Sequence, residues 1–239
     1  MFTPDGRARV AAQLQQAAED DARIVAAAFV GSTATGGDRW SDIDLSLGVA
    51  GDVPVVGVLG DWTLAMERLG GRKLFDYPAG PTIYRVFLLP GSLQVDLSFT
   101  PAASFAPTTE RFTLLFGETV DRPATEPPDP AHAFGLGVHH AVRAYISLER
   151  GRPWQAEYWL SGLRDETLAM ACIRCGLLPA HARGVDELPP DMLRRFKEAL
   201  PASLEADELR RALGAAIELL LLEGGDLAAP VAADLRALQ

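Results

Sequence analysis

The sequence predicts an α+β protein, with an N-terminal domain built on a mixed β-sheet flanked by helices and a C-terminal helical bundle domain. Three observations support this. Strand-like apolar runs alternate with helical segments up to residue 121. The segment RPATEPPDP, residues 122–130, has four prolines in nine positions and cannot sustain a helix or a central strand. Residues 131–239 have helical spacing. We therefore expect domains at 1–121 and 131–239, joined by a Pro-rich linker at 122–130.

The first elements of the N-terminal domain follow from local patterns. Residues 5–22 combine helical spacing with strong helix formers. Residues 23–31, RIVAAAFVG, form a short apolar run that predicts a strand ending at Gly31. Residues 42–49, DIDLSLGV, alternate as a half-buried strand does. Residues 54–70 predict a helix that ends at a double glycine.

A hairpin and a set of helices complete the expected order. The β-rich runs 82–90 and 92–100 are separated by a Pro-Gly turn signal, which predicts a hairpin. The expected helices of the second domain are 131–150, 154–177, 190–199, 205–223 and a short tail helix near 230.

Composition and charge exclude several functional classes. The chain of 239 residues is 48% hydrophobic and 23% charged, as globular proteins are. Its net charge of −10 and the absence of a Lys/Arg-rich run argue against a nucleic-acid polymer as partner. No apolar stretch is long enough for a membrane span, and the N-terminus has no signal-peptide core, so we expect a cytoplasmic protein. The acidity suits a small cationic partner.

The two cysteines form a CxxC pair, Cys172 and Cys175. A zinc site needs about four ligands, and no second Cys/His cluster provides them. A redox motif would follow a strand, and none precedes this pair. We interpret the pair as small apolar residues on one face of a helix.

Two expected strands carry aspartates on the face away from the core. Side chains at positions i and i+2 share a face of a strand, roughly 6.6 Å apart. In DIDLSL this places Asp42 and Asp44 opposite the apolar Ile43. In LQVDLSF it places Asp96 opposite Val95. If the two strands are neighbours, the three aspartates lie on the same face.

Three converging carboxylates require a compensating cation. They repel one another, and one must become protonated unless a positive charge lies between them. Mg²⁺ prefers oxygen ligands and completes its shell with water and substrate phosphate, and two such ions can assist phosphoryl transfer. The alternative is that the aspartates are ordinary solvated residues of a half-exposed sheet.

The pair Gly31-Ser32 lies nine residues before Asp42. Gly31 ends a strand, and STAT can open a helix with Ser32 near its N-terminus. Backbone N–H groups at such an end bind phosphate, and a serine hydroxyl adds a donor. Glycine allows the phosphate to approach without a Cβ in the way.

These residues resemble the nucleotidyltransferase superfamily of DNA polymerase beta, over about residues 10 to 120. The motif is G-S, nine residues, D-h-D-h, and a later h-D-h, where h is apolar. The added helical domain is similar to that of the antibiotic nucleotidyltransferases, which adenylylate aminoglycosides or lincosamides. The resemblance implies Mg²⁺ on Asp42 and Asp44, ATP over Gly31 and Ser32, and Asp96 as a third ligand or the general base.

The phosphate-binding arginine is the main departure from that pattern. Many relatives have Ala-Arg-Gly after the Gly-Ser pair, whereas this chain has TATGG. The basic residues that could replace the arginine are Arg39, Arg72, Lys73 and Arg85.

The helical domain adds further candidates. Along the expected helix 154–177, Trp154, Glu157, Tyr158, Ser161 and Arg164 share one face. Glu157 is an alternative general base, and Arg164 a candidate phosphate ligand. The alternative is a surface salt-bridge face beside aromatic core residues.

His139, His140 and Arg143 are further candidates for a cleft, although a lone His pair without metal spacing is more often structural or exposed.

Taken together, the sequence predicts a magnesium-dependent adenylyltransferase that moves AMP from ATP to a hydroxyl of a small molecule. The acceptor is expected to be an aminoglycoside or lincosamide. Two alternatives stay open: a protein-modifying or antitoxin-type nucleotidyltransferase, and an inactive nucleotide-binding module. An apolar segment such as AIELLLLEGG also leaves homodimerisation open.

Overall fold

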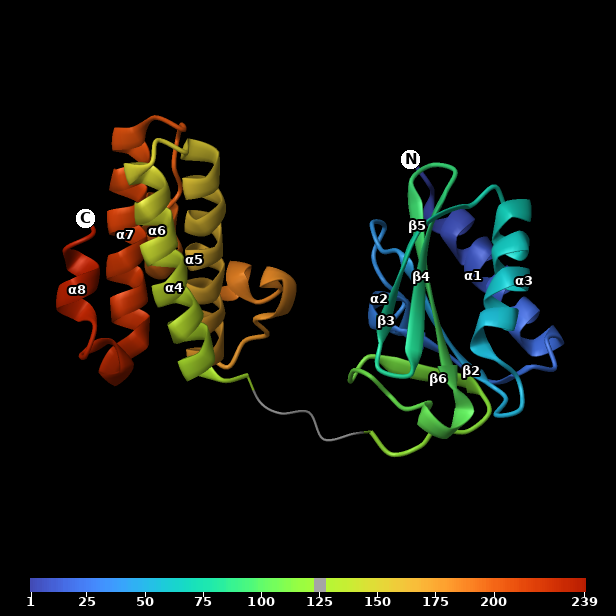
Figure 1. Cartoon of the computed structure of the whole chain (residues 1–239). Helices are drawn as coiled ribbons and strands as arrows, with labels where there is room; N and C mark the ends of the chain where they lie inside the picture. Colours follow the sequence, from blue (N-terminus) through green and yellow to red (C-terminus); the bar gives the residue numbers. More distant parts are fainter. Residues whose placement is uncertain (123–127) are drawn as a thin grey trace. The chain divides into compact units, whose positions relative to one another are not determined.

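The computed structural model describes residues 1–122 and 128–239 and confirms the α+β fold class. The chain divides into two compact units, Met1–Thr125 and Glu126–Gln239, shown in Figure 1. Of the expected Pro-rich linker, residues 123–127 lie outside the described residues. The first helix of the second unit begins at Pro130, with Asp129 as its N-cap.

A six-stranded mixed sheet forms the centre of the first unit. Its strands are β1 (Ile24–Val30), β2 (Ile43–Val49), β3 (Arg72–Ala79), β4 (Thr82–Leu89), β5 (Leu93–Pro101) and β6 (Phe112–Phe116). The spatial order is β3-β4-β5-β2-β1-β6. The pair β2 and β5 is parallel and the other neighbouring pairs are antiparallel.

Helices α1 (Pro4–Asp20) and α3 (Val55–Arg68) cover one face of this sheet (Figure 1). Thr3 caps α1 by accepting the N–H of Gly6 at 3.1 Å, and a proline at the first helical position suits a helix start. Trp62 and Met66 of α3 pack with apolar residues of β2 and β5. The core of the unit therefore lies on the side of the sheet away from Asp44.

Two strands have no counterpart among the sequence predictions. Every residue of β3 is exposed, and the register of β3 against β4 shifts between Lys73 and Phe75. Such an edge strand shows no alternation of apolar and polar residues. Strand β6 is only five residues long. The predicted hairpin is formed by β4 and β5.

The second unit is helical throughout its regular structure. It contains α4 (Pro130–Glu149), α5 (Pro153–Arg174), α6 (Pro190–Glu198), α7 (Ala206–Gly224) and α8 (Ala232–Arg236). A three-residue connection makes α4 and α5 antiparallel neighbours, and α7 lies beside them (Figure 1). Their facing residues form one apolar core.

The cysteines lie in this core as expected. Cys172 is buried in α5, Cys175 caps the same helix, and both are free thiols. Burial raises the pKa of the Cys172 thiol, which disfavours the reactive thiolate.

In the described parts of the chain, no helix combines the length and apolar character that crossing a bilayer requires.

Candidate functional site

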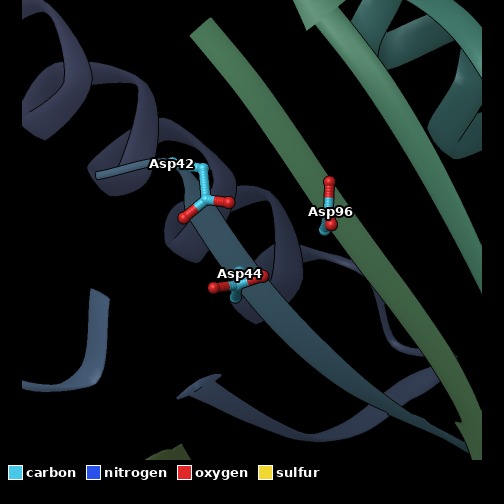
Figure 2. A group of neighbouring side chains, drawn as sticks. All are labelled: Asp42, Asp44 and Asp96. Carbon is cyan, nitrogen blue, oxygen red and sulfur yellow. The ribbon is translucent and has the colours of Figure 1, made fainter. Parts of the chain in front are cut away.

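Asp42, Asp44 and Asp96 come together on adjacent strands of the first unit. Asp44 lies on β2 directly opposite Asp96 on β5, and Asp42 immediately precedes β2. One carboxylate oxygen from each residue lies within 4.8 Å of the others. Figure 2 shows Asp44 on β2, Asp42 where the chain enters that strand, and Asp96 on the neighbouring strand. All three are partly buried, an arrangement in which they can share a cation.

Strand parity keeps these carboxylates out of the core. Ile43 and Leu45 of β2 are at most 1% exposed and pack beneath α1 and α3. Ser46 and Ser98 lie two residues after Asp44 and Asp96, respectively, on the same face of the sheet. Their buried hydroxyls form a hydrogen bond of 2.8 Å. That bond joins the two strands next to the site.

The electrostatics of the cluster favour a cation. Burial raises the pKa of Asp96, and the charge of Asp42 adds to this effect. The amide of Gln94, which donates to Asp96 Oδ1 at 3.0 Å, opposes it. A bound divalent ion would neutralise the repulsion and lower the pKa of its ligands.

Gly31 has two structural reasons to be glycine. It starts α2 (Gly31–Ala34) with φ +63°, where residues with a side chain are strained. A Cβ at this position would lie 2.8 Å from Asp44 Oδ2, closer than atoms approach without a shift. The N–H of Gly31 donates to the carbonyl of Arg111 at 2.9 Å. Gly31 therefore makes room for the carboxylate of Asp44, and its own N–H is engaged within the protein.

Thr33 ties this turn to the carboxylates, and sequence analysis did not identify it. Its hydroxyl donates to the carbonyl of Asp42 at 3.1 Å and accepts the N–H of Asp44 at 3.2 Å. Ser32 lies beside it in α2, partly buried. The Gly-Ser turn and the start of β2 thus form one hydrogen-bonded unit.

Arg7 is a second residue that sequence analysis missed. From α1 its guanidinium donates to the carbonyls of Gly36 at 3.1 Å, Ser41 at 3.2 Å, and Asp38. The Asp38 carboxylate accepts the N–H of Trp40 at 2.8 Å. These bonds hold the loop between the Gly-Ser turn and Asp42, and only the tertiary structure brings Arg7 to it.

The basic candidates for phosphate binding differ in position. Arg39 belongs to the loop that Arg7 holds, and its guanidinium stacks on the exposed Trp40 ring, 4.2 Å from the centroid. Lys73 forms a 2.7 Å ion pair with Asp76 on the edge strand. Arg72 is exposed on the same strand.

Arg85 was expected to contact phosphate, but it lies on the opposite face of the sheet from Asp96. Arg85 lies opposite Leu97 in the register, so it points to the side covered by helices, away from Asp96. It pairs with Asp76 at 2.6 Å and donates to Thr63 of α3 at 2.6 Å. Its guanidinium lowers the pKa of Asp76 to about 2, with a further contribution from Lys73. Arg85 therefore fastens α3 and the edge strand to the sheet.

The candidates of the second unit lie on α5. The closest N···O distance between Arg164 and Glu157 is 3.7 Å, and Arg164 also donates to the carbonyl of Ala199 at 3.3 Å. Trp154 and Tyr158 on the same face are 77% and 67% exposed. Glu157 as general base and Arg164 as phosphate ligand remain predictions.

The His pair at the start of this unit belongs to an aromatic cluster. His139 and His140 both lie against the ring of Trp159, with centroids 5.7 and 5.4 Å away. The guanidinium of Arg143 lies 5.5 Å from the same ring.

Comparison with known proteins gives no sequence relative. No protein-family model matches the chain, and no curated protein matches it with significance. Among solved structures, an aminoglycoside 6-adenyltransferase from Bacillus subtilis aligns with a TM-score of 0.42 and 13% identity, covering 100% of this chain and 99% of the other. A nucleotidyltransferase-like protein from Exiguobacterium sibiricum aligns with a TM-score of 0.42 and 12% identity, covering 97% and 80%. At this level of similarity, neither neighbour assigns an activity or a substrate to this chain.

Proposed function

We propose that the protein is a magnesium-dependent nucleotidyltransferase that transfers AMP from ATP to a hydroxyl group of a small molecule, an aminoglycoside or lincosamide in the first instance. The observation that carries the proposal is the meeting of three carboxylates at two parallel strands: Asp44 on β2, Asp42 just before it, and Asp96 on β5. Beside it lies a Gly-Ser turn whose glycine leaves space for one of the three carboxylates.

The donor set fits a hard divalent cation. All three candidate ligands are carboxylates, whose oxygens Mg²⁺ and Mn²⁺ prefer, and one oxygen of each lies within 4.8 Å of the others. Because Gly31 has no Cβ, the Asp44 carboxylate can occupy its observed position; a Cβ on residue 31 would displace it. When bound, the metal would supply positive charge to the phosphate oxygens and to the attacking oxygen.

The protein's own residues would position the reactants and accept one proton. In the reaction, the acceptor oxygen bonds to the α-phosphorus, the bond from that phosphorus to the bridging oxygen breaks, and pyrophosphate leaves. The hydroxyl proton passes to a carboxylate, either Asp96 or Glu157. Ser32 and the exposed Arg39 are candidates to contact the phosphates from the Gly-Ser side. Positioning and electrostatics account for most of the rate in such chemistry.

The experiment is a transfer assay with matched variants. The protein is incubated with Mg²⁺, each nucleoside triphosphate and a panel of aminoglycosides and lincosamides, and acceptors are examined for a nucleotide-sized mass gain. Asp42→Asn and Asp44→Asn are each expected to lower the rate about a hundredfold or more, because a metal ligand contributes several kcal/mol. Asp52→Asn, an exposed aspartate of the same unit, controls for the charge change. Full activity in Asp44→Asn would exclude the metal centre.

The general base is identified by a second pair of variants. If Asp96 accepts the proton, Asp96→Asn abolishes transfer while Glu157→Gln retains most of it. The reverse result assigns the base to the helical unit. Binding of Mn²⁺, measured separately, shows whether Asp96→Asn acts through the metal.

A further inference from the structure

Two cavities on the helical unit meet at one aspartate. The first, of about 220 Å³, is lined by His140, Tyr158, Trp159, Ser161, Gly162 and Asp165. The second, of about 270 Å³, is lined by Leu168, Ala169, Pro179, His181, Ala182, Val185 and again Asp165. Asp165 therefore borders two small spaces of different chemical character, and both lie within this one unit.

The first cavity has aromatic walls and two buried polar atoms without partners. Tyr158 packs edge-on against Trp159 with centroids 5.0 Å apart, and His140 lies 5.4 Å from the same ring. In the described part of the chain, Trp159 Nε1 and His140 Nδ1 are the buried side-chain nitrogen and oxygen atoms with no hydrogen-bond partner. The indole N–H can only donate, so its natural partner is a hydroxyl, ether or carbonyl oxygen.

The second cavity is mainly apolar and is bordered by a strained turn. His181 and Ala182 have φ of +55° and +57°, a conformation that residues with a side chain seldom adopt. Strained backbone conformations of this kind occur most often at binding and active sites, where the surrounding structure holds them in place. The neighbouring wall consists of Leu168 and Val185. This cavity suits an alkyl group.

Asp165 places a negative charge between the two cavities. Its side chain is exposed, and within the described residues it forms no ion pair or hydrogen bond. The adjacent Arg164 is directed to Glu157 and to the carbonyl of Ala199 instead. An unpaired carboxylate between a polar cavity and an apolar one favours a single cationic group at the junction.

We propose that these two cavities, with Asp165 between them, bind a small monoamine that has a hydroxylated ring on one side of the amine and an alkyl group on the other. The ammonium pairs with Asp165, and the ring enters the aromatic cavity. One of its oxygens accepts from the indole N–H of Trp159, which is buried without a partner in the free protein. The alkyl group fills the space beside Leu168. The site requires neither metal nor nucleotide, so it stands independently of the proposed transfer reaction.

A set of four matched probes tests each part of this ligand. N-butyl-1-deoxynojirimycin has the amine, the hydroxylated ring and the alkyl group. 1-Deoxynojirimycin lacks the alkyl group, butyl β-glucoside lacks the amine, and N-butylpiperidine lacks the hydroxyls. Binding to the full chain is measured by calorimetry and by tryptophan fluorescence, without metal or nucleotide. The complete probe is expected to bind about tenfold more tightly than each of the others.

Three variants test whether the probes bind beside Asp165. Asp165→Asn should weaken the complete probe about tenfold and leave the neutral glucoside unchanged. Asp226→Asn, also an exposed aspartate of this unit, should change neither. Gly162→Ala should weaken every ring probe, because its Cβ would lie 2.9 Å from His140 Nδ1.

A variant of the carboxylate cluster shows whether probe binding is independent of the proposed metal site. Asp42→Asn should retain full probe binding while losing transfer activity. Failure of the complete probe to bind at millimolar concentration would overturn the proposal. Equal affinities of the charged and neutral probes, or an unchanged affinity in Asp165→Asn, would overturn it as well.

Discussion

Replacement of Gly31 by alanine tests how the turn and the carboxylates are coupled. Two costs are expected. The left-handed conformation at φ +63° costs a residue with a Cβ about 1–2 kcal/mol. In addition, the methyl group would lie 2.8 Å from Asp44 Oδ2, so the carboxylate must move. Gly80 provides the matched control, because it has φ +58° and open space where its Cβ would be.

The comparison between the two variants isolates the contact with Asp44. Gly80→Ala should lose only the conformational cost, about 1–2 kcal/mol in the free energy of unfolding. Gly31→Ala should lose more, and it alone should weaken Mn²⁺ binding and lower the transfer rate. Unfolding in urea, Mn²⁺ titration and the transfer assay give the three readings. Equal stability losses together with unchanged metal affinity in Gly31→Ala would refute the proposed coupling.

Other predictions concern the sheet around the site. Because the pKa of Asp76 is lowered to about 2 by Arg85 and Lys73, its ion pairs stabilise the fold above its usual pKa. The destabilisation by Asp76→Asn at neutral pH should therefore shrink as the pH falls from about 4 to 2 in urea unfolding. Arg85→Met should lower stability yet leave unchanged the KM for the nucleoside triphosphate in the proposed transfer reaction, whereas a raised KM would indicate that Arg85 contacts the phosphates. Ser98→Ala leaves the hydroxyl of Ser46 buried without its partner and should cost about 1–3 kcal/mol, while the double alanine variant should cost less. A double variant less stable than the single one would contradict this.

The predictions that succeeded depend on local periodicity. Alternation in DIDLSL places Asp44 opposite Ile43 whatever the neighbouring strand is, because side chains alternate along any strand. Helical spacing likewise predicted α4, α5 and α7 to within a few residues. The face of Asp96 followed from the same rule. Its distance from Asp44 did not, since that depends on β2 and β5 being parallel neighbours.

The features that sequence analysis missed depend on register and on distant contacts. The face of Arg85 relative to Asp96 follows from the register of β4 against β5, which the Pro-Gly turn alone does not determine. Arg7 reaches its loop across 29 to 34 positions of sequence, and no local pattern indicates that contact. Gly31 was correctly singled out, but its nearest constraint is the carboxylate of Asp44, a contact that only the assembled sheet reveals.

The parallel pairing of β2 with β5 also bears on how the protein folds. The two strands meet across a separation of 52 positions, as between Ser46 and Ser98, with α3, β3 and β4 between them. Closing so long a loop is slow relative to forming local helices and hairpins. The docking of the β4–β5 hairpin onto β2 is therefore expected late, and a cation-binding site exists only after it. Divalent cations would then bind the native state in preference to partly folded forms, so that refolding with and without Mn²⁺ distinguishes the last assembly step from the earlier ones.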